Sequence, residues 1–226
     1  MMDSNRSGGR SALASEHGKG DNPNTVRPAR QISAWALEAR RLYLWGAVDD
    51  TSAQRIVEGM HFLSAQSDQD IQFYIHSPGG ATHSGMAILD TMQTLNCDVR
   101  TICLGLAASF GALLLMSGTP GKRHCLKNSK IMIHQPHVTG QYQSVATDLR
   151  IFADSVTRER DEIDRMIARC TGQSLEAVQK DTDRDRWIYA DEAVEYGIVD
   201  SVLEANTGSD AAVEAAQLDR SGAMVI

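Results

Sequence analysis

The 226-residue sequence lacks any apolar run of the roughly 20 residues that a membrane span requires, and its longest candidate lies around residues 113–116. It also lacks an excess of basic residues, because 22 Lys and Arg face 29 Asp and Glu and leave a net charge of −7. Phosphate backbones attract basic surfaces, so an acidic chain is a poor candidate for binding nucleic acid. We therefore expect a soluble protein with neither a membrane nor a nucleic acid as partner.

Paired cysteines are missing as well. Cys97, Cys103, Cys125 and Cys170 lie far apart, with no Cys-x-x-Cys pair and no histidine at ligand spacing. A structural zinc site is therefore not expected, and the thiols are predicted to act as small buried hydrophobic groups. The first residues lack the apolar core of a secretory signal, so a reducing cytoplasm is the expected compartment.

The sequence also has no complete nucleotide-binding loop motif. Gly121-Lys122 has no glycine at position 116 and no hydroxyl residue after it, so the phosphate-loop motif is incomplete. We expect neither a cofactor nor a metal ion on this chain.

With 42% hydrophobic and 23% charged residues, the composition is typical of a globular domain. Residues 1–30 are rich in Ser, Gly, Asn and Arg and show no apolar period, which indicates a flexible arm or a removable pro-segment. Residues 205–226 begin with a polar stretch and are predicted to be a flexible tail. One folded domain is therefore predicted over residues 31–204.

Short apolar runs alternate with helical patterns within that domain. The patterns predict strands and helices in turn, with strands at 41–45, 71–75, 99–104 and 130–133 and helices at 51–63, 82–95 and 109–117. Parallel strands need crossover connections, so this alternation favours an α/β fold with a parallel sheet.

The longest predicted helix covers residues 144–170, where apolar residues recur every three to four positions and Gly172 follows as a stop signal. A helix of this length would measure some 40 Å, which exceeds what one domain of this size can cover. We expect part of it to pack on another subunit. The alternative is a long helix that lies across its own core.

The first candidate for chemistry is Ser109, which lies between a predicted strand and a predicted helix in the small-residue stretch Gly-Leu-Ala-Ala-Ser-Phe-Gly-Ala at 105–112. A nucleophilic serine needs room for an incoming carbonyl group, and a helix N-terminus offers free N–H groups to an oxyanion. Such a stretch is also common as a close-packed turn.

A second candidate is Ser-Pro-Gly-Gly at 77–80, directly after the strand at 71–75. Adjacent glycines expose N–H groups without shielding by a Cβ atom, which suits an oxyanion donor or a strand that clamps a peptide. On its own this motif is most often a turn.

His134 is the best-placed histidine for a general base, because it ends the apolar strand at 130–133. A lone histidine there is also common as a core residue. The acid that would orient its ring remains open at this point, because Asp181, Asp183, Asp185 and Asp191 are all available. The residues alone thus indicate a serine hydrolase with an unassigned acid.

Taken together, the motifs resemble the proteolytic subunit of the Clp protease, the ClpP family of serine peptidases. The resemblance covers about residues 40–203 and rests on ordered motifs at the family's spacing, namely those at 77–80, 105–112, 121–123, 131–136, 171–174, 183–185 and 192–200. It implies an α/β fold of the ClpP and crotonase type, a spiral of ββα units with a protruding handle helix.

By that resemblance Ser109 is the nucleophile, His134 the general base and Asp185 the orienting acid. The backbone N–H groups of Gly80 and Phe110 would bind the oxyanion. An extended peptide would bind between the Gly79-Gly80 segment and the residues that follow His134, namely Gln135, Pro136, His137 and Val138.

The resemblance also implies partners. The chain would form two stacked heptameric rings, with the helix at 144–170 at their interface and with Asp183 and Arg184 linking ring contacts to triad alignment. An AAA+ unfoldase that uses ATP would feed unfolded proteins into the chamber.

Some residues depart from the family pattern. Phe110 stands where methionine is usual, and His76 replaces an asparagine. On the unfoldase-docking surface Tyr74 is kept, but aromatic residues are replaced by polar ones, namely Gln72, Thr94 and His124. Two alternatives therefore stay open: a regulatory ring subunit that depends on an active paralogue, and a crotonase-fold enzyme that acts on acyl-CoA thioesters.

Overall fold

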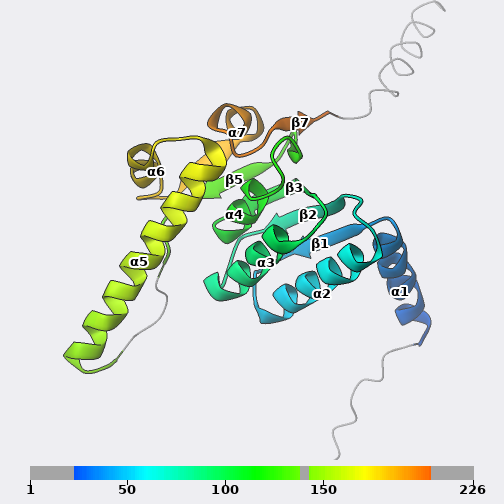
Figure 1. The fold of residues 1–226 in the computed structure, drawn as a ribbon, viewed down its shortest axis with the longest axis horizontal. Coiled ribbons are helices and arrows are strands. Elements are labelled where there is room, and N and C mark those ends of the chain that lie inside the picture. Colours follow the sequence, from blue (N-terminus) through cyan, green and yellow to red (C-terminus); the bar gives the residue numbers. More distant parts are fainter. Residues whose placement is uncertain (1–22, 138–142, 205–226) are drawn as a thin grey trace, which may run out of the picture. The chain divides into compact units, whose positions relative to one another are not determined.

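The computed structural model describes residues 23–137 and 143–204 (Figure 1). The chain divides into two units between Trp35 and Ala36. Helix α1 (Pro23–Glu38) begins in the first unit and ends in the second. The predicted domain boundary between residues 30 and 31 falls inside this helix, which begins at a proline, a residue well suited to a first helical turn. The rest of the predicted arm, Val138 and the predicted tail lie outside the described residues.

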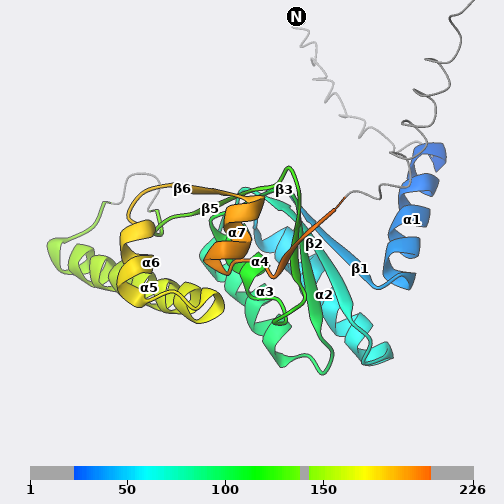
Figure 2. The same ribbon diagram turned by 90° about the horizontal axis from the view of Figure 1, so that it is seen from above.

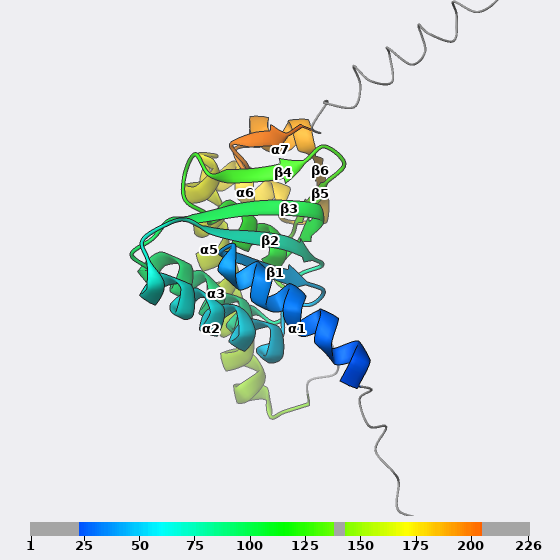
Figure 3. The ribbon, with the colours of Figure 1, turned by 90° about the vertical axis from the view of Figure 1, so that its right-hand side faces the viewer.

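The second unit is built around a seven-stranded sheet whose main path is β1-β2-β3-β4-β7. Each neighbouring pair along this path is parallel, and Figure 3 shows the strands in this order. Their bounds are β1 (Arg41–Trp45), β2 (Ile71–Ser77), β3 (Val99–Ala108), β4 (Arg123–Leu126) and β7 (Ser201–Leu203). The predicted parallel sheet is therefore confirmed.

Strand β3 changes its partner along its length. Residues 101–103 pair with β4, whereas residues 106–108 pair with β5 (Lys130–Ile133), again in parallel. Gly105 lies between the two stretches with a φ of 77°, a conformation that residues with a Cβ atom rarely adopt. Strand β6 (Arg186–Tyr189) then pairs with β5 in antiparallel orientation. The carboxyl ends of β3 and β5 consequently lie side by side.

Helices α2 (Asp50–Gln66) and α3 (Thr82–Thr94) run side by side and bury their apolar faces (Figure 1). On strand β2, Ile71, Phe73 and Ile75 are fully buried and alternate with half-exposed polar and aromatic residues. One face of the strand is therefore apolar, and it belongs to the same core as the buried faces of the two helices. The short helix α4 (Phe110–Met116) follows β3 and is buried along its whole length.

The carboxyl-terminal part contains α5 (Ala146–Thr171), α6 (Leu175–Asp181) and α7 (Ala190–Tyr196). Helix α5 ends at Gly172, which adopts the left-handed conformation with a φ of 76°. This end is the one that the sequence predicts. Figure 2 shows α6 beside α5, with α7 closer to the sheet.

Only one half of α5 is buried in this chain. Ile163, Asp164 and Ile167 are buried, whereas Val145 and Ile151 near the other end are 66% and 64% exposed. Figure 1 shows that this other end extends away from the strands. The apolar period of α5 therefore continues beyond the part that its own core covers.

The cysteines are unpaired, and three of the four are buried. Burial, together with the nearby Asp191, raises the pKa of the Cys125 thiol to about 11. A thiol with such a pKa is a poor nucleophile at neutral pH, as expected for a packing residue. None of the helices described in residues 23–137 and 143–204 is both long and apolar enough to cross a membrane.

The buried Arg123 on β4 connects three elements. Its guanidinium donates to the carboxylate of Asp200, with 2.7 Å from Nη2 to Oδ1, and to the carbonyl oxygens of Cys170 and Gly197 at 2.7 and 2.9 Å. Burial alone would raise the pKa of Asp200, but the hydrogen bonds from Arg123 outweigh it and hold that pKa below its usual value.

We predict that Arg123→Met lowers the free energy of unfolding by about 3–5 kcal/mol, because the partly buried Asp200 carboxylate loses its cation and the carbonyl groups of Met116, Cys170 and Gly197 lose their side-chain donor. The pKa of Asp200 is lowered in the folded state, so this stabilisation is present above the unfolded pKa and is lost as the pH falls through the folded pKa. Denaturant unfolding at pH 7 and at acid pH measures both effects.

The matched control is Lys122→Met. Lys122 bonds Asp70 and Asp98 at 2.7 and 2.8 Å at the surface, where water screens the charges, so its loss should cost much less stability than the loss of Arg123. Equal losses of stability in the two variants would contradict the conclusion that the buried hydrogen bonds of Arg123 stabilise the fold.

Candidate active site

Ser109 is the single residue between β3 and α4, and its backbone is strained. Its φ of 53° and ψ of −124° are unfavourable for a residue with a side chain and cost about 1–3 kcal/mol. The surrounding structure holds it there, because the N–H of Ser109 donates to the carbonyl oxygen of Met132 in β5 at 2.8 Å. The hydroxyl group is thereby fixed at a sharp turn at the end of the strand.

His134 follows β5 directly, and the parallel pairing of β5 with β3 places it beside Ser109. The distance from His134 Nε2 to Ser109 Oγ is 2.8 Å. The side chain of His134 is only 12% exposed. The two candidate residues are thus within hydrogen-bond distance although 25 positions separate them.

Asp185 precedes β6, and the antiparallel register pairs Arg186 with Ile133, so Asp185 lies opposite His134. Its Oδ1 is 3.1 Å from His134 Nδ1. A carboxylate only accepts, so Nδ1 carries the proton and Nε2 accepts the proton of the Ser109 hydroxyl.

Two of the other aspartates of this segment have different partners. Asp181 accepts from the Tyr196 hydroxyl at 3.0 Å and pairs with Arg186, and Asp183 pairs with Arg160 at 3.7 Å. The strand register therefore places Asp185, and not Asp181 or Asp183, next to His134. Residue type alone could not distinguish these aspartates.

Gly79 and Gly80 border the serine from the other side. A Cβ atom on Gly79 would lie 2.7 Å from Ser109 Cβ, so this close approach requires glycine. The chain is held here by Val48, whose N–H donates to Gly79 and whose carbonyl accepts from Ala81, at 2.9 and 2.8 Å. No backbone hydrogen bond within the described ranges uses the N–H of Gly80 or of Phe110. Both N–H groups are thus available to a negatively charged oxygen.

A cleft of about 670 Å³ adjoins these residues. Its lining includes Gly80, Ser109 and His134, together with apolar side chains from three further elements, namely Phe110, Leu113, Met116, Ile133, Ile163 and Ile167. Glu159 and His83 add polar groups. The cleft therefore offers an apolar lining to a side chain bound next to the serine.

The predicted peptide-binding residues do not all have the same surroundings. Pro136 and His137 line the cleft, and Val138 lies outside the described residues. Gln135 has internal contacts instead: its backbone N–H donates to Thr182 and its side-chain amide to Asp183, at 2.7 and 2.8 Å to the carbonyl oxygens. Gln135, the residue after His134, thus connects this segment to the loop that carries Asp185.

Asp164 on α5 supports the same loop and was not found by sequence reasoning. It is 1% exposed, and its Oδ1 lies 2.9 Å from the hydroxyl of Thr182. Its Oδ2 has no hydrogen-bond partner within the described chain, and the nearest cation, Arg160, is 3.8 Å away. Burial raises the pKa of Asp164 against the opposing effects of Thr182 and Arg160.

The Thr182 hydroxyl carries one proton but has two acceptors in reach, Asp164 Oδ1 at 2.9 Å and the carbonyl oxygen of Val178 at 3.0 Å. A neutral group at position 164 that donates to Thr182 would let the hydroxyl donate to Val178. An asparagine satisfies this arrangement, with its amide oxygen facing Arg160.

We therefore predict that Asp164→Asn raises the free energy of unfolding at pH 7 by on the order of 1 kcal/mol. The pKa of Asp164 is raised in the folded state, so wild-type stability falls as the pH rises from the unfolded pKa through the folded one. The gain from the substitution should consequently shrink in acid. Denaturant unfolding at both pH values tests this, with the exposed Asp154→Asn as control, and a loss of stability at pH 7 would refute it.

A second prediction concerns Gly80, whose φ is 154°. A Cβ atom here would lie 2.1 Å from the carbonyl oxygen of Val48. Gly80→Ala should therefore displace the segment beside Ser109, slow labelling by a fluorophosphonate roughly tenfold or more and destabilise the fold by about 1–3 kcal/mol.

Gly121→Ala is the control for Gly80→Ala, because Gly121 also has a positive φ, 83°, but has open space around it. It should lower stability through backbone strain alone and leave the labelling rate unchanged. Equal labelling rates in the two variants would show that the clash with Val48 does not reach the serine.

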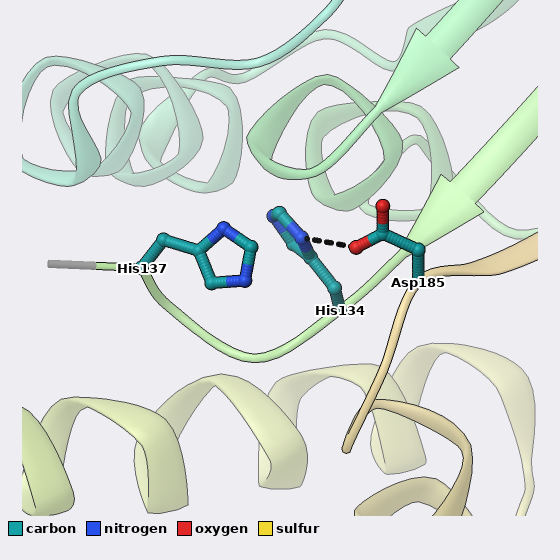
Figure 4. Close-up of side chains that lie close together, drawn as sticks. All are labelled: His134, His137 and Asp185. Atoms are coloured by element: carbon teal, nitrogen blue, oxygen red, sulfur yellow. Dashed lines mark hydrogen bonds and ion pairs between the residues drawn. The ribbon is translucent and has the colours of Figure 1, made fainter. Parts of the chain in front are cut away.

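Figure 4 shows a further feature of the site, the side chain of His137 next to those of His134 and Asp185. The rings of His134 and His137 meet edge to face, with centroids 4.3 Å apart. Sequence reasoning assigned His137 to peptide binding and did not foresee this cluster, because the bend after β5 brings the two rings together.

A comparison with protein-family models supports the assignment made from the motifs. The model described as Clp protease matches residues 26–206, about four fifths of the chain. The predicted fold class, an α/β fold of the ClpP type, is confirmed by this match and by the mixed sheet with its helices. The peptidase family model matches nearly the whole described chain, and His134 lies within hydrogen-bond distance of both Ser109 and Asp185, so this chain belongs to the Clp protease family.

Proposed function

We propose that this chain is the proteolytic subunit of an ATP-dependent Clp protease, a serine endopeptidase that hydrolyses unfolded polypeptides. The observation that carries the proposal is the continuous series of contacts from Ser109 Oγ to His134 Nε2, at 2.8 Å, and from His134 Nδ1 to Asp185 Oδ1, at 3.1 Å. Nucleophile, base and orienting acid are thus within reach of one another, as acyl transfer requires.

In the proposed reaction Ser109 Oγ attacks the carbonyl carbon of the peptide bond while His134 Nε2 takes the hydroxyl proton. Asp185 stabilises the imidazolium that forms. His134 then gives the proton to the leaving amine, which departs and leaves an acyl ester on Ser109. A water molecule, activated by the same ring, releases the acid and restores the serine.

Charge on the tetrahedral intermediate would be bound by the N–H groups of Gly80 and Phe110, each worth a few kcal/mol to the transition state. The position of Phe110 at the start of α4 supports this role, because the first N–H groups of a helix have no acceptor within it. The peptide would lie extended between the Gly79-Gly80 segment and the segment after His134, with one apolar side chain in the cleft.

The proposed assembly is two stacked heptameric rings. The exposed apolar residues at the outer end of α5 and at its N-cap, Leu149, Ile151 and Val145, support an interface there, because exposed apolar side chains gathered in one place mark contact surfaces. Asp183 and Arg184 are proposed to link this contact to the triad, since Asp183 already pairs with Arg160 on α5. The cytoplasm is the proposed compartment, which the four unpaired cysteines support.

The proposed unfoldase partner would dock on the strand surface that carries Tyr74. There Tyr74 donates to the side chain of Gln72 at 2.9 Å and stacks on Tyr43. His124 is likewise engaged, with 2.9 Å from its Nδ1 to the Ser201 hydroxyl. This polar surface favours one second candidate function, a regulatory ring subunit that works beside an active paralogue.

We predict that Ser109→Ala abolishes labelling by a fluorophosphonate probe and leaves the melting temperature within a few degrees of the wild type, because only one hydroxyl group is removed. Ser64→Ala on α2 is the control and should label normally. Persistent labelling of Ser109→Ala would reject the nucleophile assignment.

A fluorogenic unstructured peptide separates the two candidate functions. Cleavage by the isolated wild-type chain supports the proteolytic subunit. Cleavage that begins only when an active paralogue is added, and that persists with Ser109→Ala, supports the regulatory subunit.

A further inference from the structure

We propose that His134, His137 and Asp185 form a binding site for a divalent transition-metal ion of the zinc type, and that the bound ion switches the peptidase off. Each residue offers one ligand atom, and the three atoms lie within 4.8 Å of one another. Figure 4 shows the ring of His134 between that of His137 and the carboxylate of Asp185. The inhibitory part of this proposal rests on the proposed function, but the binding part does not.

The geometry is close to what such an ion needs. Zinc binds imidazole nitrogen and carboxylate oxygen at about 2.0–2.2 Å, so two ligands of a tetrahedral ion lie about 3.3 Å apart. His134 Nδ1 and Asp185 Oδ1 are 3.1 Å apart, which is close to this separation, and rotation of the exposed Asp185 carboxylate would move its oxygen aside to make room for the ion. The third ligand, His137, has an exposed side chain that can close the remaining gap by rotation. Water would complete the coordination.

The donor set also selects the class of ion. Two imidazole groups and one carboxylate suit zinc and similar transition metals, whereas magnesium and calcium prefer sites made of oxygen atoms. The cluster is accessible, because His137 and Asp185 are both exposed and the cleft beside them is open to solvent. An ion can thus reach the site without opening the fold.

Occupation would disable the base through its tautomer. In the active arrangement His134 carries its proton on Nδ1 and accepts the proton of Ser109 on Nε2. A metal ion needs the lone pair of Nδ1, so the proton of the neutral ring moves to Nε2. An Nε2–H group facing Ser109 Oγ cannot accept the hydroxyl proton, and Asp185 is then bound to the metal instead of the ring. No bond in the protein is broken, so removal of the ion restores activity.

The binding experiment is isothermal titration of the folded full-length protein with zinc chloride. We expect one site per chain in the wild type and an affinity weakened roughly tenfold or more in His137→Leu, because one of three ligands is lost. His61→Leu, which removes an exposed histidine on α2, is the matched control and should bind as the wild type does. Equal affinity in wild type and His137→Leu would overturn the site.

The activity experiment titrates peptide hydrolysis with zinc chloride. Half-inhibition of His137→Leu, each protein measured against its own metal-free rate, should need roughly tenfold more zinc than half-inhibition of the wild type or of His61→Leu. A chelator should restore the rate, and magnesium chloride should have no effect.

The two experiments fail in different ways. Inhibition that is equally strong in His137→Leu would place the ion elsewhere and refute the proposal. A chain that binds zinc through His137 but hydrolyses no peptide would retain the metal site and reject the proposed function. His137→Gln, compared by circular dichroism with the wild type, replaces His137→Leu if that variant does not fold.

Discussion

The site depends on one piece of backbone pairing, the parallel contact between the last residues of β3 and β5. Because β3 bends at Gly105, its first half can pair with β4 and its second half with β5 on the same edge. The residues that follow the two strands, Ser109 and His134, then emerge next to each other. The antiparallel strand β6 adds Asp185 from the other side. Strand pairing alone therefore brings together three residues that are distant in sequence.

Much of this was predictable from the sequence. Short apolar runs predicted β1, β2 and β5 to within two residues, and the apolar period of α5 together with Gly172 predicted the extent of that helix to within two residues at each end. The sequence prediction ended β3 at Leu104, before Gly105. The strand instead continues to Ala108, since the glycine supplies a bend and not a stop. The short elements after residue 172 were not predicted, because strands of three or four residues and helices of seven carry too little periodicity.

The choice of the acid shows where local patterns end. Four aspartates share one polar segment, and their spacing does not distinguish them. The register of β6 on β5 does, because it sets Arg186 opposite Ile133. Asp164 was missed for a related reason, because a charged residue inside a charged stretch of helix is normally predicted to lie on the surface. Only the fold shows that its side chain is 1% exposed and bonded to Thr182. The family resemblance supplied Asp185 where the residues could not.

The pairing of β5 has one more consequence. The carbonyl group of Met132 holds Ser109 in its unfavourable backbone conformation, and β5 and β6 are four-residue strands that lie off the main path of the sheet. Short strands at a margin open locally at lower free energy than a central sheet does. On warming, the edge strand β6 should exchange its amide hydrogens first, and its loss would uncover β5 and let the serine relax into an ordinary turn. The proposed peptidase activity would then be lost reversibly before melting, in a chain that is still folded.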